Sequence, residues 1–268
     1  LAVMAAAGTI SAKITLPEII GDNMVLQQDT KVRIWGKASA GKTVTITTSW
    51  SREKTKVTAD GDGNWLALVQ TPAASYTQHS MVISDGEAVK LDNILIGEVW
   101  FCGGQSNMEM PLNGFWDCPI EGSNEEIATS GKRSGIRLVK IPKTGTLAPS
   151  ETVEGKWELS NPQNARWFSA TAWYFARMLN EALDIPVGLV SCNWGGTRVE
   201  SWLPEETVRT YPDIDYDTEC CKKEQTWWHY SNVTIMYNGM YHPIRNYTVK
   251  GFIWYQGEAN VAKHDTYT

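Results

Sequence analysis

Gly-Glu-Val-Trp-Phe-Cys-Gly-Gly-Gln-Ser-Asn-Met, residues 97–108, is the stretch that decides the fold of this chain. An apolar run ending at Cys102 is followed by two glycines and a serine, which predicts a buried strand, a tight turn and a helix beginning at Ser106. The carboxyl end of a parallel strand lies where open α/β sheets bind ligands, and a helix N-terminus offers N–H groups that favour a developing negative charge. Ser106 is therefore a candidate nucleophile. The local pattern is equally typical of a glycine turn with a helix-capping serine.

Two later stretches repeat the order of an apolar strand followed by glycine and polar residues. Residues 187–202 read Val-Gly-Leu-Val-Ser-Cys-Asn-Trp-Gly-Gly-Thr-Arg-Val-Glu-Ser-Trp, and residues 252–260 read Phe-Ile-Trp-Tyr-Gln-Gly-Glu-Ala-Asn. Because the carboxyl ends of parallel strands meet at one edge of a sheet, we expect the three strand ends to converge on one site.

The pattern of the chain changes near residue 95. From residue 13 to about residue 93, short alternating segments with turns, including a hairpin-like turn at residues 60–64, predict a small β-sandwich or jelly roll. After residue 95, strands alternate with helices, which predicts βαβ units and a parallel sheet. The predicted division is a β-domain at 13–94 and an α/β domain at 95–268. The elements expected in the second part are strands at 98–102, 136–141, 187–192 and 249–255, and a helix at 169–183.

Composition limits the partners that the chain can have. It is 42% hydrophobic and 20% charged, which is typical of a globular protein. The net charge is −6 and there is no run of lysines or arginines, so nothing marks a surface for nucleic acid or for an anionic membrane.

The N-terminus and the cysteines bear on the compartment. Residues 1–12 are small and apolar, which is typical of the tail of a secretory signal peptide, and they are too few to cross a membrane. We therefore expect a periplasmic or secreted protein. Five cysteines are an odd number without zinc-ligand spacing, so at least one thiol stays free and no metal site is expected. Cys102 and Cys192 end apolar strands and should be buried thiols, whereas a disulfide between Cys220 and Cys221 is not expected.

The three stretches together resemble a known family. Gly-Gln-Ser-Asn-Met (104–108), Gly-Gly-Thr-Arg-Val-Glu-Ser-Trp (195–202) and Trp-Tyr-Gln-Gly-Glu-x-Asn (254–260) are similar to the ordered blocks of SGNH hydrolases, and in particular of the sialate O-acetylesterase family of carbohydrate esterases. The resemblance covers nearly the whole chain. It implies a flavodoxin-like three-layer α/β fold with a parallel sheet, preceded by a small all-β domain. It also implies a serine esterase that removes O-acetyl groups from sialic acid without metal or cofactor.

The same resemblance assigns roles in an ester-cleaving site. Ser106 is the nucleophile, and its own N–H is one donor of the oxyanion hole. A glycine N–H at Gly195 or Gly196 and the side-chain amide of Asn260 complete the hole. Either glycine fits the pattern, and Gly196 is favoured.

Three further residues have weaker assignments. Gln105 is expected to brace the loops rather than to touch substrate. Glu258 either orients a catalytic histidine or hydrogen-bonds loop amides, and the second role is favoured. Arg198 either pairs with the carboxylate of a sialic acid or forms an ion pair with Glu200 or Glu98.

The catalytic base is the part that the sequence does not supply. The family carries it as a histidine in an Asp-x-x-His segment, and no such segment occurs in these 268 residues. His79 should lie on the surface of the β-domain, His242 should pack before the last strand, His264 falls near the end, and His229 is the only candidate within the chain. We therefore predict that the C-terminal part of the hydrolase domain is missing. That segment, on a second chain or lost, would carry the catalytic aspartate and histidine.

Two alternatives to a sialate esterase remain open. Related families with the same glycine and serine blocks act on plant glycans, so an acetylxylan esterase or another glycan acetylesterase keeps the chemistry and changes the sugar. A non-catalytic glycan-binding protein is the alternative from another class, supported by the lack of the histidine segment.

Overall fold

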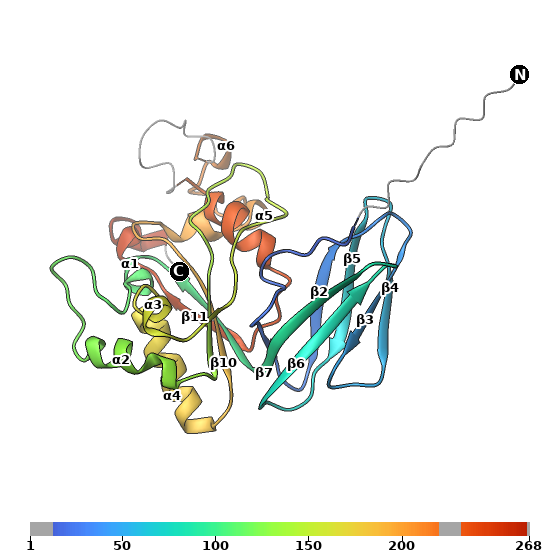
Figure 1. Cartoon of the computed structure of the whole chain (residues 1–268). Helices are drawn as coiled ribbons and strands as arrows, with labels where there is room; N and C mark the ends of the chain where they lie inside the picture. Colours follow the sequence, from blue (N-terminus) through green and yellow to red (C-terminus); the bar gives the residue numbers. More distant parts are fainter. Residues whose placement is uncertain (1–12, 220–231, 267–268) are drawn as a thin grey trace, which may run out of the picture.

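The computed structural model describes residues 13–219 and 232–266 (Figure 1). The strands are β1 (Val25–Gln27), β2 (Lys31–Lys37), β3 (Thr43–Thr48), β4 (Lys54–Thr58), β5 (Asn64–Gln70), β6 (Ser75–Ser84), β7 (Ala88–Gly104), β8 (Ile136–Lys140), β9 (Glu158–Leu159), β10 (Val187–Asn193) and β11 (Gly251–Tyr255). The α-helices are α1 (Ser106–Glu109), α2 (Ser123–Thr129), α3 (Pro162–Ala165), α4 (Ala170–Leu183), α5 (Glu205–Val208) and α6 (Tyr216–Glu219). The predicted signal remnant (1–12), the Cys220 and Cys221 pair and His229 lie outside the described residues. No described helix is both long and apolar enough to span a bilayer.

Strand β7 runs for 17 residues and links the two halves of the molecule. Its first part pairs antiparallel with β6, whereas β1, β10 and β11 pair parallel with its later part. The large sheet has the order β4-β3-β6-β7-β10-β8-β9, and β1 and β11 also pair with β7. The domain boundary predicted after residue 94 therefore falls inside a continuous strand.

The α/β class is confirmed, but the sheet is mixed rather than parallel throughout. The strands predicted after residue 95 correspond to the end of β7 and to β8, β10 and β11, and the predicted helix corresponds to α4. Strand β9 pairs antiparallel with β8, and the strands before β7 add an antiparallel part to the same sheet. The short β9 follows a long irregular segment and carries no strand pattern of its own.

The hairpin-like turn predicted at residues 60–64 forms, but the strands on its two sides pair with other strands rather than with each other. Strand β4 pairs with β3 in the large sheet, whereas β5 pairs with β2 in a separate two-stranded sheet. The Asp60 carboxylate accepts the N–H groups of Asp62 at 2.9 Å and Asn64 at 2.8 Å, so the side chain folds the turn. The local turn chemistry is the one expected, but the turn carries the chain from one sheet to another. The alternation of apolar and polar residues is the same whether the two strands pair with each other or lie in different sheets, so the sequence pattern could not distinguish the two arrangements.

Two apolar cores lie on opposite faces of the parallel strands. Neighbouring residues in a strand point to opposite faces, and accordingly Phe101 belongs to one core and Cys102 to the other. Helix α4 packs Trp173 into the core that contains Cys102. Figure 1 shows α2, α3 and α4 together on one side of β10 and β11. The opposite core includes Met236 and Met240 and continues into the strands of the first hundred residues.

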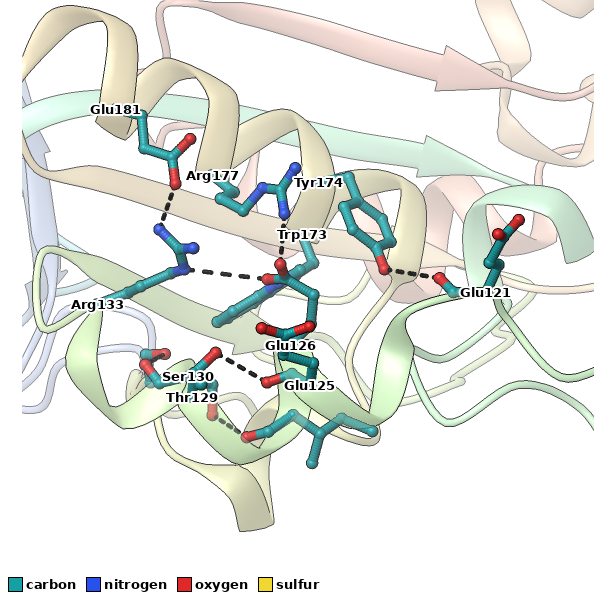
Figure 2. A network of polar contacts seen from close by, with 12 residues as sticks. Glu121, Glu125, Glu126, Thr129, Ser130, Arg133, Trp173, Tyr174, Arg177 and Glu181 are labelled. Atoms are coloured by element: carbon teal, nitrogen blue, oxygen red, sulfur yellow. Dashed lines mark hydrogen bonds and ion pairs between the residues drawn. The ribbon is translucent and has the colours of Figure 1, made fainter.

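A buried carboxylate fastens α2 to α4 (Figure 2). Glu126 accepts hydrogen bonds from Trp173 Nε1 at 3.1 Å and from Arg177 Nη1. Arg133 lies 3.9 Å from the same carboxylate and pairs with Glu181 at 2.6 Å. Burial disfavours the charged form, but the hydrogen bonds from Trp173 and Arg177 outweigh it and hold the pKa of Glu126 below its usual value. The network therefore joins α2 to α4, the helix whose Trp173 packs into the core on one face of the sheet.

Candidate active site

Ser106 follows directly from the end of β7, at a point where two neighbouring strands also end. In the strand register Gly104 lies between Asn193 of β10 and Tyr255 of β11. The Trp194 N–H donates to the Gly104 carbonyl at 3.0 Å, and the Gln105 N–H donates to the Tyr255 carbonyl at 3.0 Å. The sequence prediction that three strand ends converge is therefore confirmed for the backbone of these strands.

Glycine is required at position 104 by its surroundings. Its φ is +141°, and a Cβ there would lie 2.1 Å from the Tyr255 carbonyl oxygen. No side chain fits at that distance from another strand's backbone. The glycine therefore lets β7 approach β11 closely and turn sharply into α1, so that Ser106 begins the helix at the sheet edge.

The side chain of Ser106 is half-buried, and its Oγ has no hydrogen-bond partner among the described residues. It does not cap its own helix, because Gln105 occupies the N-cap position and makes no side-chain cap bond. The hydroxyl is thus not engaged in the capping role that the local sequence pattern equally allowed.

The glycine pair after β10 lies beside this serine. A Cβ on Gly195 would lie 3.4 Å from Ser106 Cβ and 3.5 Å from its Cα. The Gly195 N–H donates to Glu109 Oε2 at 2.5 Å. Gly196 is exposed and has a φ of +79°, a conformation that favours glycine. The first and second sequence blocks therefore meet at Ser106.

Gln105 ties α1 to the loop after β11. Its side chain is 3% exposed, and its Oε1 accepts the N–H groups of Gly257 at 3.3 Å and Ala259 at 3.1 Å. The same oxygen accepts Gln256 Nε2 at 3.2 Å. These contacts are those of a brace between the first and third sequence blocks.

Asn260 is buried and connects the third block to the second. Its Oδ1 accepts the Val199 N–H at 3.0 Å and Gln256 Nε2 at 2.6 Å. Its Nδ2 donates to Glu200 Oε2 at 2.8 Å. One hydrogen of the Asn260 amide is thus used by Glu200, and the other is the one that an oxyanion role would require.

Glu258 and Arg198 have different surroundings. Glu258 is exposed and accepts a hydrogen bond from the side-chain amide of Asn107, the residue after the serine. Arg198 is half-buried and has no ion pair among the described residues. Its two expected partners are engaged elsewhere, since Glu200 binds Asn260 and Glu98 lies 3.6 Å from Lys250.

Neither of the histidine side chains that the structure describes is at this site. His79 Nδ1 contacts Ser49 Oγ at 3.1 Å on the strands before β7, and burial lowers its pKa. His242 Nδ1 lies 2.8 Å from the Ser150 carbonyl and 2.9 Å from Arg245 Nη1, before β11 as predicted. The side chains of His229 and His264 are not among those described.

The two thiols nearest the strand ends are not candidate nucleophiles. Cys102 and Cys192 are free and fully buried, as predicted. Burial raises the pKa of both thiols well above the usual value, so both stay in the unreactive neutral form. Ser106, in contrast to these two thiols, is only half-buried.

Sequence reasoning missed three residues that hold the site together. Glu109 and Lys143 form an ion pair of 2.5 Å beside Gly195, and Glu200 orients Asn260. Glu109 carried a detectable signal, because a residue three positions after a serine on a helix faces the same side. Lys143 carried none, since it lies in the irregular segment after β8.

A serine on a turn between a parallel strand and a short helix, beside a glycine loop from the next strand, places the chain among α/β proteins built like hydrolases. A family model described as "Carbohydrate esterase, sialic acid-specific acetylesterase" matches residues 96–268, and the chain belongs to that family. The resemblance stated from the sequence blocks is therefore confirmed.

Individual relatives agree with this assignment. A sialate O-acetylesterase from Pongo abelii is 29% identical over 266 residues, which cover 90% of this chain and 48% of that protein. The Homo sapiens sialate O-acetylesterase is 28% identical over 265 residues, with the same coverage. The crystal structure of a carbohydrate acetylesterase from Xanthomonas citri superimposes with a TM-score of 0.79 at 29% identity, covering 92% of this chain and 52% of that one. The chain thus spans about half the length of these relatives.

Proposed function

We propose that this chain provides the nucleophile and oxyanion donors of a serine esterase that removes O-acetyl groups from sialic acids. The observation that carries the proposal is the proximity of Gly195 to Ser106 at the adjoining ends of β10 and β7, where a Cβ on the glycine would lie 3.4 Å from Ser106 Cβ. Two of the three blocks that define the resemblance thereby lie beside one hydroxyl that has no hydrogen-bond partner among the described residues. The names of the relatives support the choice of acetyl ester and of sugar.

In the proposed reaction, Ser106 Oγ attacks the acetyl carbonyl carbon while a base takes the hydroxyl proton. The carbonyl oxygen becomes negative and is stabilised by N–H donors. The intermediate then expels the sugar oxygen, which receives that proton from the base, and leaves an acetyl group on Ser106. Attack of water by the same route releases acetate and restores the hydroxyl.

The proposed donors are the N–H groups of Ser106 and Gly196 and the second N–H of the Asn260 amide. Gly196 is the favoured glycine of the pair, and it directly follows Gly195, whose N–H donates to Glu109. Loss of one such donor typically lowers turnover by roughly a hundredfold to a thousandfold. Gln105 and Glu258 are proposed to act as supports, because each binds a neighbouring loop or helix residue.

We propose that the base is a histidine outside the described side chains. His79 and His242 have partners elsewhere in the fold, and the family's Asp-x-x-His segment does not occur in this sequence. His229, His264 or a further segment of a longer protein would supply it. Substituting His229 and His264 by alanine separates these sources, because unchanged turnover in both variants leaves only the further segment.

Arg198 is proposed to recognise the sialate carboxylate, since it has no ion pair among the described residues. Arg198→Ala should then weaken turnover of an O-acetylated sialic acid far more than turnover of a neutral aryl acetate. Equal losses on both substrates would favour the neutral-sugar reading, a glycan acetylesterase such as one acting on acetylxylan.

The decisive experiment compares the chain with Ser106→Ala, using a fluorophosphonate probe and an aryl acetate. The proposal expects covalent labelling at Ser106 and loss of at least a thousandfold in turnover in the variant. Labelling elsewhere, or none in a folded protein that contains the family's histidine segment, would favour a non-catalytic glycan-binding protein.

We also propose that the protein is exported and that its N-terminal strands have a packing role. The small, apolar residues 1–12 support a periplasmic or secreted location. Residues 13–94 are proposed to form a small all-β domain that packs against the hydrolase part, and the core shared between the two supports packing. Recovery of the protein from the periplasmic fraction of expressing cells would test the location.

A further inference from the structure

Glu109 makes two charged contacts beside the serine. Its Oε2 accepts the Gly195 N–H at 2.5 Å, and its Oε1 lies 2.5 Å from Lys143 Nζ. The Glu109 side chain is 16% exposed and the Lys143 side chain is 40% exposed, so the carboxylate is largely shielded from water while the lysine reaches the surface. Lys143 also lies 5.5 Å from the centre of the Trp194 ring, next to the glycine pair. Residues from α1, the segment after β8 and the loop after β10 thus meet at one carboxylate.

We propose that Glu109 is a positioning residue for the oxyanion loop and that Lys143 is its counter-ion. This inference rests on the proposed function. A hydrogen bond from a backbone N–H to a carboxylate is charge-assisted and therefore strong. By fixing the Gly195 N–H to the helix that carries Ser106, Glu109 sets the place of the next N–H, that of Gly196, relative to the nucleophile.

Lys143 is inferred to offset the negative charge that Glu109 brings close to the nucleophile. Glu109 Oε2 and Ser106 Cβ both lie within 3.5 Å of the same point beside Gly195. A carboxylate so close to the reacting carbonyl opposes the negative charge that develops on its oxygen. Lys143 neutralises Glu109, so the carboxylate can hold the loop without that penalty.

The chain contains a matched control for this arrangement. Glu18 accepts the Gly155 N–H at 2.9 Å and lies 3.7 Å from Lys156 Nζ. It therefore repeats the set of one carboxylate, one glycine N–H and one lysine. Neither of these two contacts of Glu18 involves α1 or the loop after β10.

The test measures kcat and KM for an aryl acetate in an active form of the protein. Glu109→Ala should lower kcat by about tenfold or more with little change in KM, and Glu109→Gln, which keeps an acceptor oxygen, should recover most of it. Glu18→Ala should stay within about twofold of the unchanged protein. Lys143→Met should lower kcat, and adding Glu109→Gln to it should raise kcat again, a rescue that a merely structural role does not predict. Equal kcat in Glu109→Ala and Glu18→Ala would overturn the inference.

A second readout does not depend on activity. Amide hydrogen exchange of Gly195, followed by NMR, should be at least tenfold faster in Glu109→Ala and unchanged in Glu18→Ala. Unchanged exchange in Glu109→Ala would refute the positioning role by itself. If Ser106→Ala shows that the chain is no esterase while Gly195 exchange responds as expected, the proposed function fails and the tie between Glu109 and the loop stands.

Discussion

Replacing Gly104 by alanine tests the geometry on which the whole site depends. The added Cβ would lie 2.1 Å from the Tyr255 carbonyl oxygen, 2.7 Å from its carbon and 3.0 Å from its nitrogen. All three atoms are backbone, so relief requires β11 to move away from β7 by about 1.3 Å or more to reach ordinary contact distance. The φ of +141° adds strain that glycine alone avoids.

The cost can be worked from these two effects. A residue held in a sparsely populated backbone region costs about 1–3 kcal/mol, and an extra carbon forced into a filled space costs about 1–3 kcal/mol. Gly104→Ala should therefore lower the free energy of unfolding by about 2–6 kcal/mol. For a chain of this size each kcal/mol corresponds to roughly 2–4 °C, so Tm should fall by roughly 5–20 °C.

The assay is thermal unfolding followed by circular dichroism, with turnover measured on the same samples at a temperature where both remain folded. Gly61→Ala is the matched control, because a Cβ there meets nothing within 4 Å, and its Tm should stay within about 2 °C. If Gly104→Ala has the same Tm as Gly61→Ala and keeps full turnover, the close approach of β7 and β11 is refuted.

Three further predictions follow from the site and its support. Gly195→Ala should fold normally but lower turnover by about tenfold or more, because the methyl group fills space against the nucleophile; full turnover with a normal Tm contradicts this. In the folded state the pKa of Glu126 is lowered, so its contribution to stability is present above its unfolded pKa of about 4.3 and is lost as the pH falls through the folded value. The free energy of unfolding, measured with urea between about pH 6 and pH 3, should thus depend less steeply on pH in Glu126→Gln than in the unchanged protein. Parallel plots of that free energy against pH for the two proteins would refute the contribution of Glu126. Thiol labelling with peptide mapping should modify Cys118, which is exposed, well before Cys102 or Cys192, and equal rates would contradict their burial.

The strands that build the site could be predicted because each is an apolar run, and the ends of β7, β10 and β11 lie at or within two residues of a glycine. Hydrophobic runs identify β8, β10 and β11 locally, and the parallel order of such strands brings their carboxyl ends together. The pairing of β5 with β2 could not be predicted in the same way. It depends on which sheet accepts a strand after a turn, and the Asp60 turn is locally compatible with either sheet.

The site itself was predictable only where the backbone at a strand end fixes the position of a residue. Ser106 and Gly195 satisfy that condition, and they meet. The lack of an ion pair at Arg198 among the described residues was not predictable, since it arises because both candidate glutamates are engaged by other residues, Glu200 by Asn260 and Glu98 by Lys250. Such choices depend on side chains that come together only after the strands have paired.

The ties between the three loops form a closed set, and this bears on how the site would work. Gln105 joins α1 to the loop after β11, Asn260 joins that loop to the segment after the glycine pair, and Glu109 joins the glycine pair back to α1. These ties span 154, 61 and 86 residues of sequence, so no local pattern encodes them. Donors stabilise a developing oxyanion best when they are fixed before the reaction, because no free energy is then spent on turning them. A site held at all three sides by hydrogen-bonded side chains meets that requirement without a bound substrate, and breaking any one tie should therefore lower kcat more than it raises KM.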